Sequence, residues 1–345
     1  MSQQAYYNTK DITSVLRSLL ESAHVRRVFI VHGKGSYVAC GAAEILNEVC
    51  QGLSVSEFMD FSVNPKDEEA QKGMQLLLAA KPDIIISVGG GSAMDMSKLI
   101  RHYAAEQGCN VPLWAIPTTA GTGAEATHFA VVYKEGVKHS MEADDILPDV
   151  AILYAPFTYA NSAYLTACTG FDALAQAIEA FWNPKATDES RQYSLRAIEM
   201  IYQQLPECIA HPEQTNLRDE ILQGAYWAGR AINMTKTTAP HAFSYVFTSK
   251  YGYPHGHAVA LTFPFFMKLN GTPELYEQLG MSAANAMEQM EKYIASLGLS
   301  LQLPGVVDVD SALQAVNMQR LSNNPVLMTA ERTAELANYL KNHQE

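Results

Sequence analysis

The feature that most limits the fold of this chain is an alternation of short apolar runs with longer helical stretches between Arg27 and about Pro156. The mainly apolar segments at 28–31, 84–88 and 113–116 and the segment at 55–58 predict strands, and the stretches at 37–50, 66–80 and 93–106 predict helices. Short apolar strands separated by helices indicate a parallel sheet that helices cover on both faces. The sequence therefore predicts an α/β domain with a doubly wound, Rossmann-like parallel sheet.

A change of pattern indicates a second domain. Residues 128–153 predict a β-hairpin with its turn at Gly136 and one further strand at 150–153. After Pro156 only helical patterns follow, at 161–182, 187–203, 217–232, 239–248, 257–270, 275–297 and 329–342. A chain of 345 residues is also longer than one hydrophobic core commonly serves. We therefore predict a dinucleotide-binding domain over 1–158 and an all-helical, metal-binding domain over 159–345.

Composition and charge exclude several classes of partner. The chain is 48% apolar and 17% charged, as is usual for a globular enzyme, and no apolar run reaches the length of a membrane span. A formal charge of −12 argues against a nucleic-acid partner, because phosphate backbones need a basic surface. The first seven residues lack the basic and apolar regions of a secretory signal, so we expect a cytoplasmic location. The five scattered cysteines contain no C-x-x-C pair and predict neither a disulfide framework nor a thiolate zinc site.

Three glycines follow the predicted strand at 84–88. Gly89, Gly90 and Gly91 lead through Ser92 into a predicted helix. Glycine allows close approach to a ligand, and a helix start presents unpaired N–H groups to a phosphate. The segment therefore predicts a pyrophosphate site, although an ordinary turn capped by Ser92 would use the same residues. The G-x-G-x-x-G pattern of most dinucleotide folds is absent.

A second polar loop, at 117–125, follows the next predicted strand. It contains Thr118, Thr119 and Thr122 among glycines. Doubly wound sheets bind ligands at the carboxyl ends of their strands. One such loop could be an ordinary surface loop, but two of them after neighbouring strands favour a nucleotide.

The helical half contains candidate metal ligands. Asp172 and Gln176 are four residues apart, on one face of a predicted helix. His241 and His255 are fourteen residues apart, and Gly252 and Pro254 predict a helix end and a turn that would bring His255 back beside His241. One carboxylate and two imidazoles suit Fe²⁺ or Zn²⁺ with open coordination positions. The same side chains could instead be separate buried or capping groups.

These motifs together resemble the iron-containing (group III) alcohol dehydrogenase family. They are Gly89-Gly90-Gly91-Ser92-x-x-Asp95-x-x-Lys98, the loop at 117–123, Asp172 and the Pro254-His255-Gly256 turn, in order over about 25–270. The resemblance implies a dehydroquinate synthase-like architecture of an α/β domain and a helical domain. It implies that Asp172, His241 and His255 ligate the metal. The dinucleotide would be held by Gly33, Gly89, Gly90, Gly91, Ser92, Asp95, Lys98, Thr118, Thr119 and Thr122.

Two departures from the family pattern affect the expected ligands. Iron-type members have a histidine four residues after the aspartate, where this chain has Gln176. Gln176 could bind the metal through its carbonyl oxygen, act through a water molecule, or leave a three-ligand site. NAD-preferring members often have an aspartate after the first strand, where this chain has Gly33 and Lys34. An acidic residue there would repel a 2′-phosphate, so we predict NADPH in preference to NADH.

The segment at 233–241 suggests the substrate. Lys236 and Thr237 precede the helix that would contain His241, and with Thr238 and Arg230 they could bind an oxyanion. Together with 253–258 this segment resembles the phosphonoacetaldehyde reductase branch of the family, which implies reduction of phosphonoacetaldehyde to 2-hydroxyethylphosphonate. Lys236 could instead be a solvent-exposed lysine beside a helix cap.

The implied reaction is hydride transfer from the nicotinamide to an aldehyde that the metal polarises. His257, two residues after a ligand, or a chain of water molecules at the metal could supply the proton. Packing near the helix start is the alternative role for His257. Other functions are a general short-chain alcohol dehydrogenase, a dehydroquinate synthase-like lyase, and a nucleotide-binding protein whose metal site decayed at Gln176. We expect a dehydrogenase of small aldehydes or alcohols that forms a homodimer.

Overall fold

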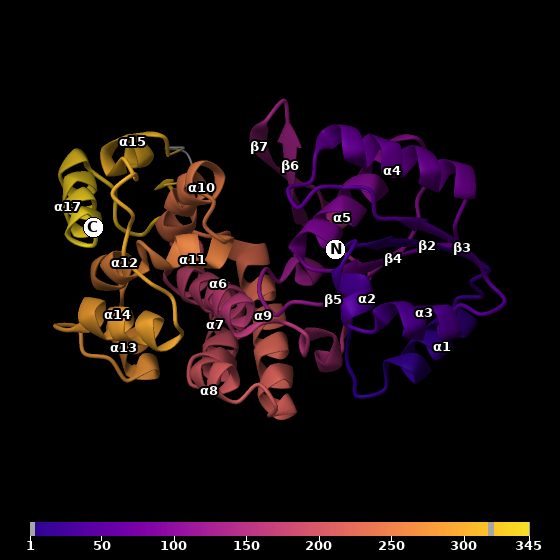
Figure 1. Cartoon of the computed structure of the whole chain (residues 1–345), viewed down its shortest axis with the longest axis horizontal. Coiled ribbons are helices and arrows are strands. Elements are labelled where there is room, and N and C mark those ends of the chain that lie inside the picture. The colour runs from indigo at the N-terminus through magenta and orange to yellow at the C-terminus, as the bar shows by residue number, and fades with distance from the viewer. Residues whose placement is uncertain (1–3, 317–320, 345) are drawn as a thin grey trace. The chain divides into compact units, whose positions relative to one another are not determined.

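The computed structural model describes residues 4–316 and 321–344, in two compact units, Met1–Asn161 and Ser162–Glu345 (Figure 1). The boundary that we predict after residue 158 lies three residues before this division. Within the described residues, no helix is both long and apolar enough to cross a lipid bilayer.

The first unit is built on a six-stranded parallel sheet with the order β1-β8-β5-β4-β2-β3. Its strands are β1 (Ala5–Asn8), β2 (Arg27–His32), β3 (Ser54–Phe58), β4 (Ile84–Gly89), β5 (Leu113–Pro117) and β8 (Val150–Leu153). Because β3 and β4 pair with opposite edges of β2, the winding of the chain reverses between β2 and β4. Doubly wound sheets bind ligands at such a reversal, beyond the carboxyl ends of the strands.

Alternate residues of each central strand face opposite sides of this sheet. Val28 and Ile30 pack in one apolar cluster with helices α1 (Ile12–Ser22) and α3 (Ala42–Val49). Phe29 and Val31 pack in another with α4 (Asp67–Ala80) and α5 (Gly91–Glu106), on the opposite face (Figure 1). This arrangement confirms the predicted doubly wound fold, because period-two alternation of apolar residues buries both faces.

The structure contains the predicted hairpin but divides the first predicted helix into two. Strands β6 (Phe129–Lys134) and β7 (Val137–Glu142) pair in antiparallel fashion. Glu135 and Gly136 join them with positive φ, as a tight hairpin turn requires. The helix predicted at 37–50 is in fact two helices, α2 (Ser36–Ala39) and α3, because Gly41 between them has a φ of +80°. Short helical turns η1, η2 and η3 cover Ala124–Ala126, Asp144–Ile146 and Ala155–Thr158.

The named elements of the second unit, within its described residues, are all helices. Its first helices are α6 (Ala163–Trp182), α7 (Asp188–Ile201), α8 (Gln204–Ala210), α9 (Thr215–Thr235), α10 (Ala239–Tyr251) and α11 (His255–Ala260). They are followed by α12 (Phe263–Asn270), α13 (Pro273–Leu279), α14 (Ala286–Ser296), α15 (Val309–Gln314) and α17 (Ala330–Asn342). Helix α6 packs against α7, α9 and α11 and is almost entirely buried (Figure 1). Polar side chains on α6 therefore need partners inside the unit.

Two helices predicted as single segments are each divided. The segment at 257–270 forms α11 and α12, with Pro264 in the first turn of α12, where a missing N–H costs least. The segment at 275–297 forms α13 and α14, because Gly280 ends α13 with a φ of +63°. Pro264 and Gly280 were the local signals of these two breaks, and the prediction of single helices did not use them.

Candidate functional site

Helix α6 carries three polar side chains on one buried face. The Ser162 hydroxyl caps the helix by accepting a hydrogen bond of 3.2 Å from the backbone of Leu165. Asp172, Gln176 and Glu179 follow at spacings of four and three residues, which places them on one side of the helix. All three side chains are buried. The sequence analysis selected the first two and missed Glu179.

The turn between α10 and α11 brings the two histidines together. Helix α10 ends at Gly252, whose φ is +75°, and α11 begins at His255 directly after Pro254. The rings of His241 and His255 have centroids 5.3 Å apart, which confirms the predicted return of the chain. Gly256 permits this packing, because a Cβ atom at this position would lie only 1.8 Å from the carbonyl oxygen of Cys168 on α6.

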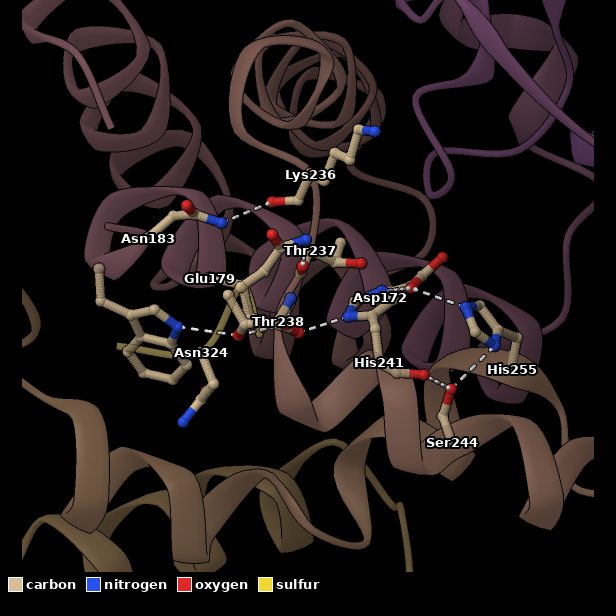
Figure 2. Close-up of polar contacts among 12 residues, drawn as sticks. Asp172, Glu179, Asn183, Lys236, Thr237, Thr238, His241, Ser244, His255 and Asn324 are labelled. Atoms are coloured by element: carbon tan, nitrogen blue, oxygen red, sulfur yellow. Dashed lines mark hydrogen bonds and ion pairs between the residues drawn. The ribbon is translucent and has the colours of Figure 1, made fainter. Parts of the chain in front are cut away.

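The two histidines and Asp172 converge on one point (Figure 2). Asp172 Oδ1 lies 3.1 Å from His241 Nε2 and 3.8 Å from His255 Nε2. One ligand atom from each of the three residues lies within 4.8 Å of the others. Asp172 and His241 are buried, whereas the side chain of His255 is 33% exposed. The group has the donor types and the partial exposure of a divalent-metal site with open positions.

Both histidines have their other ring nitrogen occupied. His241 Nδ1 bonds to Glu179 Oε1. The Ser244 hydroxyl donates to the His241 carbonyl oxygen at 2.8 Å, so at 3.4 Å from His255 Nδ1 it serves as an acceptor. With a proton on each Nδ1, both Nε2 lone pairs remain for a metal. The second contacts of the histidines thus fit a metal ion.

The electrostatics of the site also fit a cation. Burial alone would lower the pKa of His241, but the carboxylates of Glu179 and Asp172 raise it to about 10. A metal ion at Nε2 would replace the proton that these carboxylates attract. Gln176 lies one helical turn after Asp172, and its Oε1 is buried without a hydrogen-bond partner among the described residues. An orphaned amide oxygen is costly, and a cation would satisfy it.

His257 uses both ring nitrogens within the helical unit. Its Nε2 lies 2.7 Å from the carbonyl oxygen of Ser300, so Nε2 carries the proton. Its Nδ1 therefore accepts the hydrogen bond from the Tyr164 hydroxyl, at 2.9 Å. Since Tyr164 is 48% exposed, any proton exchange between His257 and solvent passes most directly through this phenol.

The predicted oxyanion residues are not gathered into one group. Lys236 is exposed and has a positive φ of 66° with a ψ of 173°, and its side chain points away from the three metal ligands in Figure 2. Thr237 is half-buried, and its carbonyl oxygen accepts a bond of 3.4 Å from Asn323. Arg230 instead lies over the ring of Tyr193, with its guanidinium 5.1 Å from the ring centroid. This position favours a packing role for Arg230.

The N-terminus of α10 already binds a carboxylate of the protein itself, that of Glu179. Thr238 donates to Glu179 Oε2 through its backbone N–H, at 2.5 Å, and through its hydroxyl, at 2.8 Å. The positive end of the helix is therefore occupied by the Glu179 carboxylate, which suits a helix N-terminus. An external oxyanion would have to be recognised by the Lys236 and Thr237 side chains rather than by these N–H groups.

In the α/β unit, three glycines allow the loops that follow neighbouring strands to approach one another closely. A Cβ atom at Gly89 would lie 3.7 Å from the backbone nitrogen of Gly33, at the reversal point between β4 and β2. A Cβ at Gly90 would lie 3.1 Å from Thr119 Oγ1, and one at Gly91 would lie 2.9 Å from Thr122 Cγ2. Loops far apart in sequence thus line one cradle whose walls are backbone and small side chains. Such a surface lets a pyrophosphate approach N–H groups closely.

The remaining predicted cofactor residues differ in their surroundings. Thr118 Oγ1 is buried and has no hydrogen-bond partner among the described residues, which leaves it for a ligand. The Ser92 hydroxyl bonds to the carbonyl oxygen of Val63. Asp95 accepts a bond of 3.1 Å from the backbone of Val131 in β6.

Lys98 is enclosed within the α/β unit. Its ammonium donates to Thr127 Oγ1 at 3.0 Å and to the Phe129 carbonyl oxygen at 2.9 Å. Burial lowers the pKa of Lys98 to about 8 and raises that of Asp95 to about 6. These positions favour a structural role for Asp95 and Lys98, which tie α5 to β6, over the predicted contact with a dinucleotide.

Comparisons with known proteins assign both units of the chain to one family. Residues 4–155 match the family described as iron-containing alcohol dehydrogenase, and residues 166–339 match its C-terminal domain family. The NAD-dependent methanol dehydrogenase of Bacillus methanolicus is 30% identical, over 83% of this chain and 84% of its own length. The phosphonoacetaldehyde reductase of Streptomyces viridochromogenes is 30% identical, over 75% of this chain and 76% of its own length.

A solved structure is similar over the whole chain. The sulfoacetaldehyde reductase of Bifidobacterium kashiwanohense, solved in complex with NAD⁺, superposes with a TM-score of 0.91 at 27% identity. The similarity covers 99% of this chain and 97% of that protein. The relatives named here are dehydrogenases and reductases, which argues against the lyase alternative. The chain belongs to the iron-containing alcohol dehydrogenase family and is an oxidoreductase of that family.

Proposed function

We propose that this protein reduces phosphonoacetaldehyde to 2-hydroxyethylphosphonate with NADPH and a divalent metal, Fe²⁺ or Zn²⁺. The observation that carries the proposal is the convergence of Asp172, His241 and His255, with both Nε2 atoms directed at one carboxylate oxygen. We further propose that Gln176 supplies a fourth ligand through its otherwise unpartnered Oε1. An amide oxygen is a weaker donor than an imidazole, so this position would be the most readily exchanged.

When bound, the metal would act as a Lewis acid toward the aldehyde oxygen, and the dinucleotide would supply the hydride. The residues of the chain hold and orient these groups and handle the proton. The Tyr164 hydroxyl and His257 form a hydrogen-bonded pair with an exposed outer end. A protonated His257 would donate through Tyr164, whose own proton would pass to the product alkoxide.

The cofactor part of the proposal rests on the end of β2. Gly33 provides no carboxylate to repel a 2′-phosphate, and Ser36 Oγ lies 2.8 Å from where a Cβ at Gly33 would be. Lys34, the next residue, is exposed and forms an ion pair of 3.0 Å with the exposed Asp60. A lysine and a hydroxyl at this place suit NADPH, and NADH is the alternative.

The substrate part of the proposal rests on Lys236, which is exposed two residues before the N-cap of α10. Two of the relatives named above reduce, by their names, two-carbon aldehydes that carry a phosphonate or a sulfonate. An ammonium recognises the charge of either anion. A charge-assisted hydrogen bond of this kind contributes about 1.5–3 kcal/mol, which corresponds to roughly 10–100-fold in affinity. We also propose a homodimer in the cytoplasm, which light scattering and cell fractionation would check.

The test compares rates of NADPH oxidation with phosphonoacetaldehyde and with propionaldehyde, in the metal-reconstituted wild type and in Lys236→Met. We expect the wild type to prefer phosphonoacetaldehyde and Lys236→Met to raise the KM for it by roughly 10–100-fold, with the KM for propionaldehyde unchanged. Lys268→Met, which removes another exposed lysine of the same unit, is the matched control.

Other outcomes would change the function. Equal rates with both aldehydes in the wild type would indicate a general short-chain alcohol dehydrogenase and place Lys236 outside the site. No oxidation with either aldehyde, in protein that still binds nucleotide, would indicate a nucleotide-binding protein with a decayed metal site.

A further inference from the structure

Glu179 is a buried carboxylate beside the metal ligands that the reaction described above does not use. We infer that Glu179 is a positioning residue: it holds His241 in the tautomer that leaves Nε2 available to the metal. The inference rests on the proposed metal site and adds a residue that controls its affinity for metal.

The carboxyl group of Glu179 is fully enclosed and surrounded by donors. Its relative exposure is 0%. Its Oε2 accepts the backbone N–H and the hydroxyl of Thr238, at 2.5 and 2.8 Å, and its Oε1 faces His241 Nδ1 (Figure 2). An enclosed carboxylate is tolerated only when its oxygens are hydrogen-bonded in this way. An ionised carboxylate oxygen can only accept, so His241 must donate to Oε1 through Nδ1.

A donor-only side chain fixes the direction of the hydrogen bonds. Trp182 Nε1 lies 3.0 Å from Thr238 Oγ1, and an indole N–H can only donate. Thr238 Oγ1 therefore accepts from Trp182 and donates its own proton to Glu179. The order of donation runs from Trp182 through Thr238 to Glu179, which also receives the His241 proton at its other oxygen.

The tautomer of His241 follows from this order. When Nδ1 carries the proton, the Nε2 lone pair points to the place where Asp172 and His255 converge. Carboxylates that bond to the outer nitrogen of a metal-binding histidine fix its tautomer and orientation, and their loss typically lowers metal affinity or activity by about 10–100-fold. Glu179 is seven residues after Asp172 on α6, so one rigid helix holds both carboxylates against the same imidazole.

Glu179→Gln gives a sharp test because the amide is nearly isosteric but has only one acceptor. The two donors of Thr238 would claim the amide oxygen, and the amide NH₂ would then face His241 Nδ1. That contact would require Nδ1 to accept and Nε2 to carry the proton, which blocks the metal. Glu288→Gln on α14 removes the same charge from an exposed side chain and is the matched control.

The measurement is the dissociation constant for Zn²⁺, from competition with a chromogenic chelator. It uses the full-length wild type, Asp172→Asn, Glu179→Gln, Glu179→Asp and Glu288→Gln, each checked for folding by circular dichroism. We expect Glu179→Gln to weaken Zn²⁺ binding by about 10–100-fold and Glu288→Gln to leave it unchanged. Glu179→Asp keeps the charge but is one methylene too short to reach both partners, so we expect weakening there also.

The outcomes separate this inference from the proposed metal site. If the wild type binds Zn²⁺ no more tightly than Asp172→Asn, the proposed site itself is wrong. If Asp172→Asn loses Zn²⁺ while folded Glu179→Gln binds it as tightly as the wild type, the inference about Glu179 is overturned. If Glu179→Gln does not fold, Glu179→Asp decides: weakened binding supports the inference, and unchanged binding overturns it.

Discussion

Replacing Gly256 by alanine would separate α11 from α6 at the metal site. A Cβ atom at this position would lie 1.8 Å from the Cys168 carbonyl oxygen, 2.8 Å from the Cys168 carbonyl carbon and 3.1 Å from Asp172 Cβ. Real Cβ atoms are essentially never found within 3.0 Å of such atoms, so a shift of more than about 1 Å is needed. The nearest obstacles are backbone atoms of a buried helix, which cannot rotate away. We therefore expect α11 to move and to carry His255 with it.

The expected effect of Gly256→Ala is large because metal sites tolerate only small changes in ligand position. Metal–ligand distances are held to within about 0.2 Å, and a misplacement of about 1 Å can cost about 100-fold in rate. We expect Gly256→Ala to lose about 100-fold or more in Zn²⁺ affinity and in aldehyde reduction. Overpacking should also lower the free energy of unfolding by about 1–3 kcal/mol.

The assay measures Zn²⁺ affinity by chelator competition and the unfolding free energy by urea titration. Gly35→Ala is the matched control, because a Cβ there meets nothing within 4 Å and the backbone φ is −101°. If Gly256→Ala bound Zn²⁺ as tightly as Gly35→Ala, the close approach of α11 to α6 would not be what positions His255.

Three further predictions concern other groups. Lys98→Met should lower the unfolding free energy by about 3–5 kcal/mol, because it leaves Asp95 and Glu125 buried without their cation. The control is Lys34→Met, which breaks an exposed ion pair and should cost about 1 kcal/mol or less. A loss in Lys98→Met no larger than that in Lys34→Met would contradict the prediction. Because Glu179 and Asp172 raise the pKa of His241 to about 10, a proton competes with the metal below that pH. The association constant for Zn²⁺ should therefore rise about tenfold per pH unit from about pH 7 to about pH 9, and a flat profile would contradict the assignment. Gly33→Asp should shift the ratio of kcat/KM for NADH to kcat/KM for NADPH toward NADH by about tenfold or more. The new carboxylate would repel the 2′-phosphate of NADPH, and like charges about 4 Å apart cost about 1–4 kcal/mol. An unchanged ratio would place Gly33 outside the cofactor site.

The sequence predicts the sheet and the histidine turn because local signals determine them. The run at 28–31 is apolar at every position and the run at 84–88 at every position except Ser87, a pattern typical of strands buried on both faces. Gly252 and Pro254 stop one helix and start the next, so the return of His255 toward His241 could be expected from the chain itself. The breaks between α11 and α12 and between α13 and α14 were missed although Pro264 and Gly280 mark them, because a proline or a glycine inside an apolar stretch does not always end a helix.

The roles of Lys98 and Glu179 could not be predicted because their partners are distant in sequence. Lys98 belongs to a motif beside a phosphate loop, but its acceptors, Thr127 and Phe129, lie about thirty residues away and turn it inward. Glu179 is a single acid in a helix, which is usually an exposed residue. The apolar composition of α6 on all sides was the available signal that this acid would be buried.

The most direct test of the account is to measure metal content and aldehyde reduction together. Wild type and His241→Ala would be stripped with a chelator, reloaded with Fe²⁺ or Zn²⁺, desalted, and assayed with NADPH and phosphonoacetaldehyde. We predict that the stripped wild type is inactive, that it regains activity with about one metal ion per chain, and that folded His241→Ala regains neither metal nor activity. Full activity in the stripped wild type, or restored activity in His241→Ala, would show that the metal centre at Asp172, His241 and His255 does not carry the reaction.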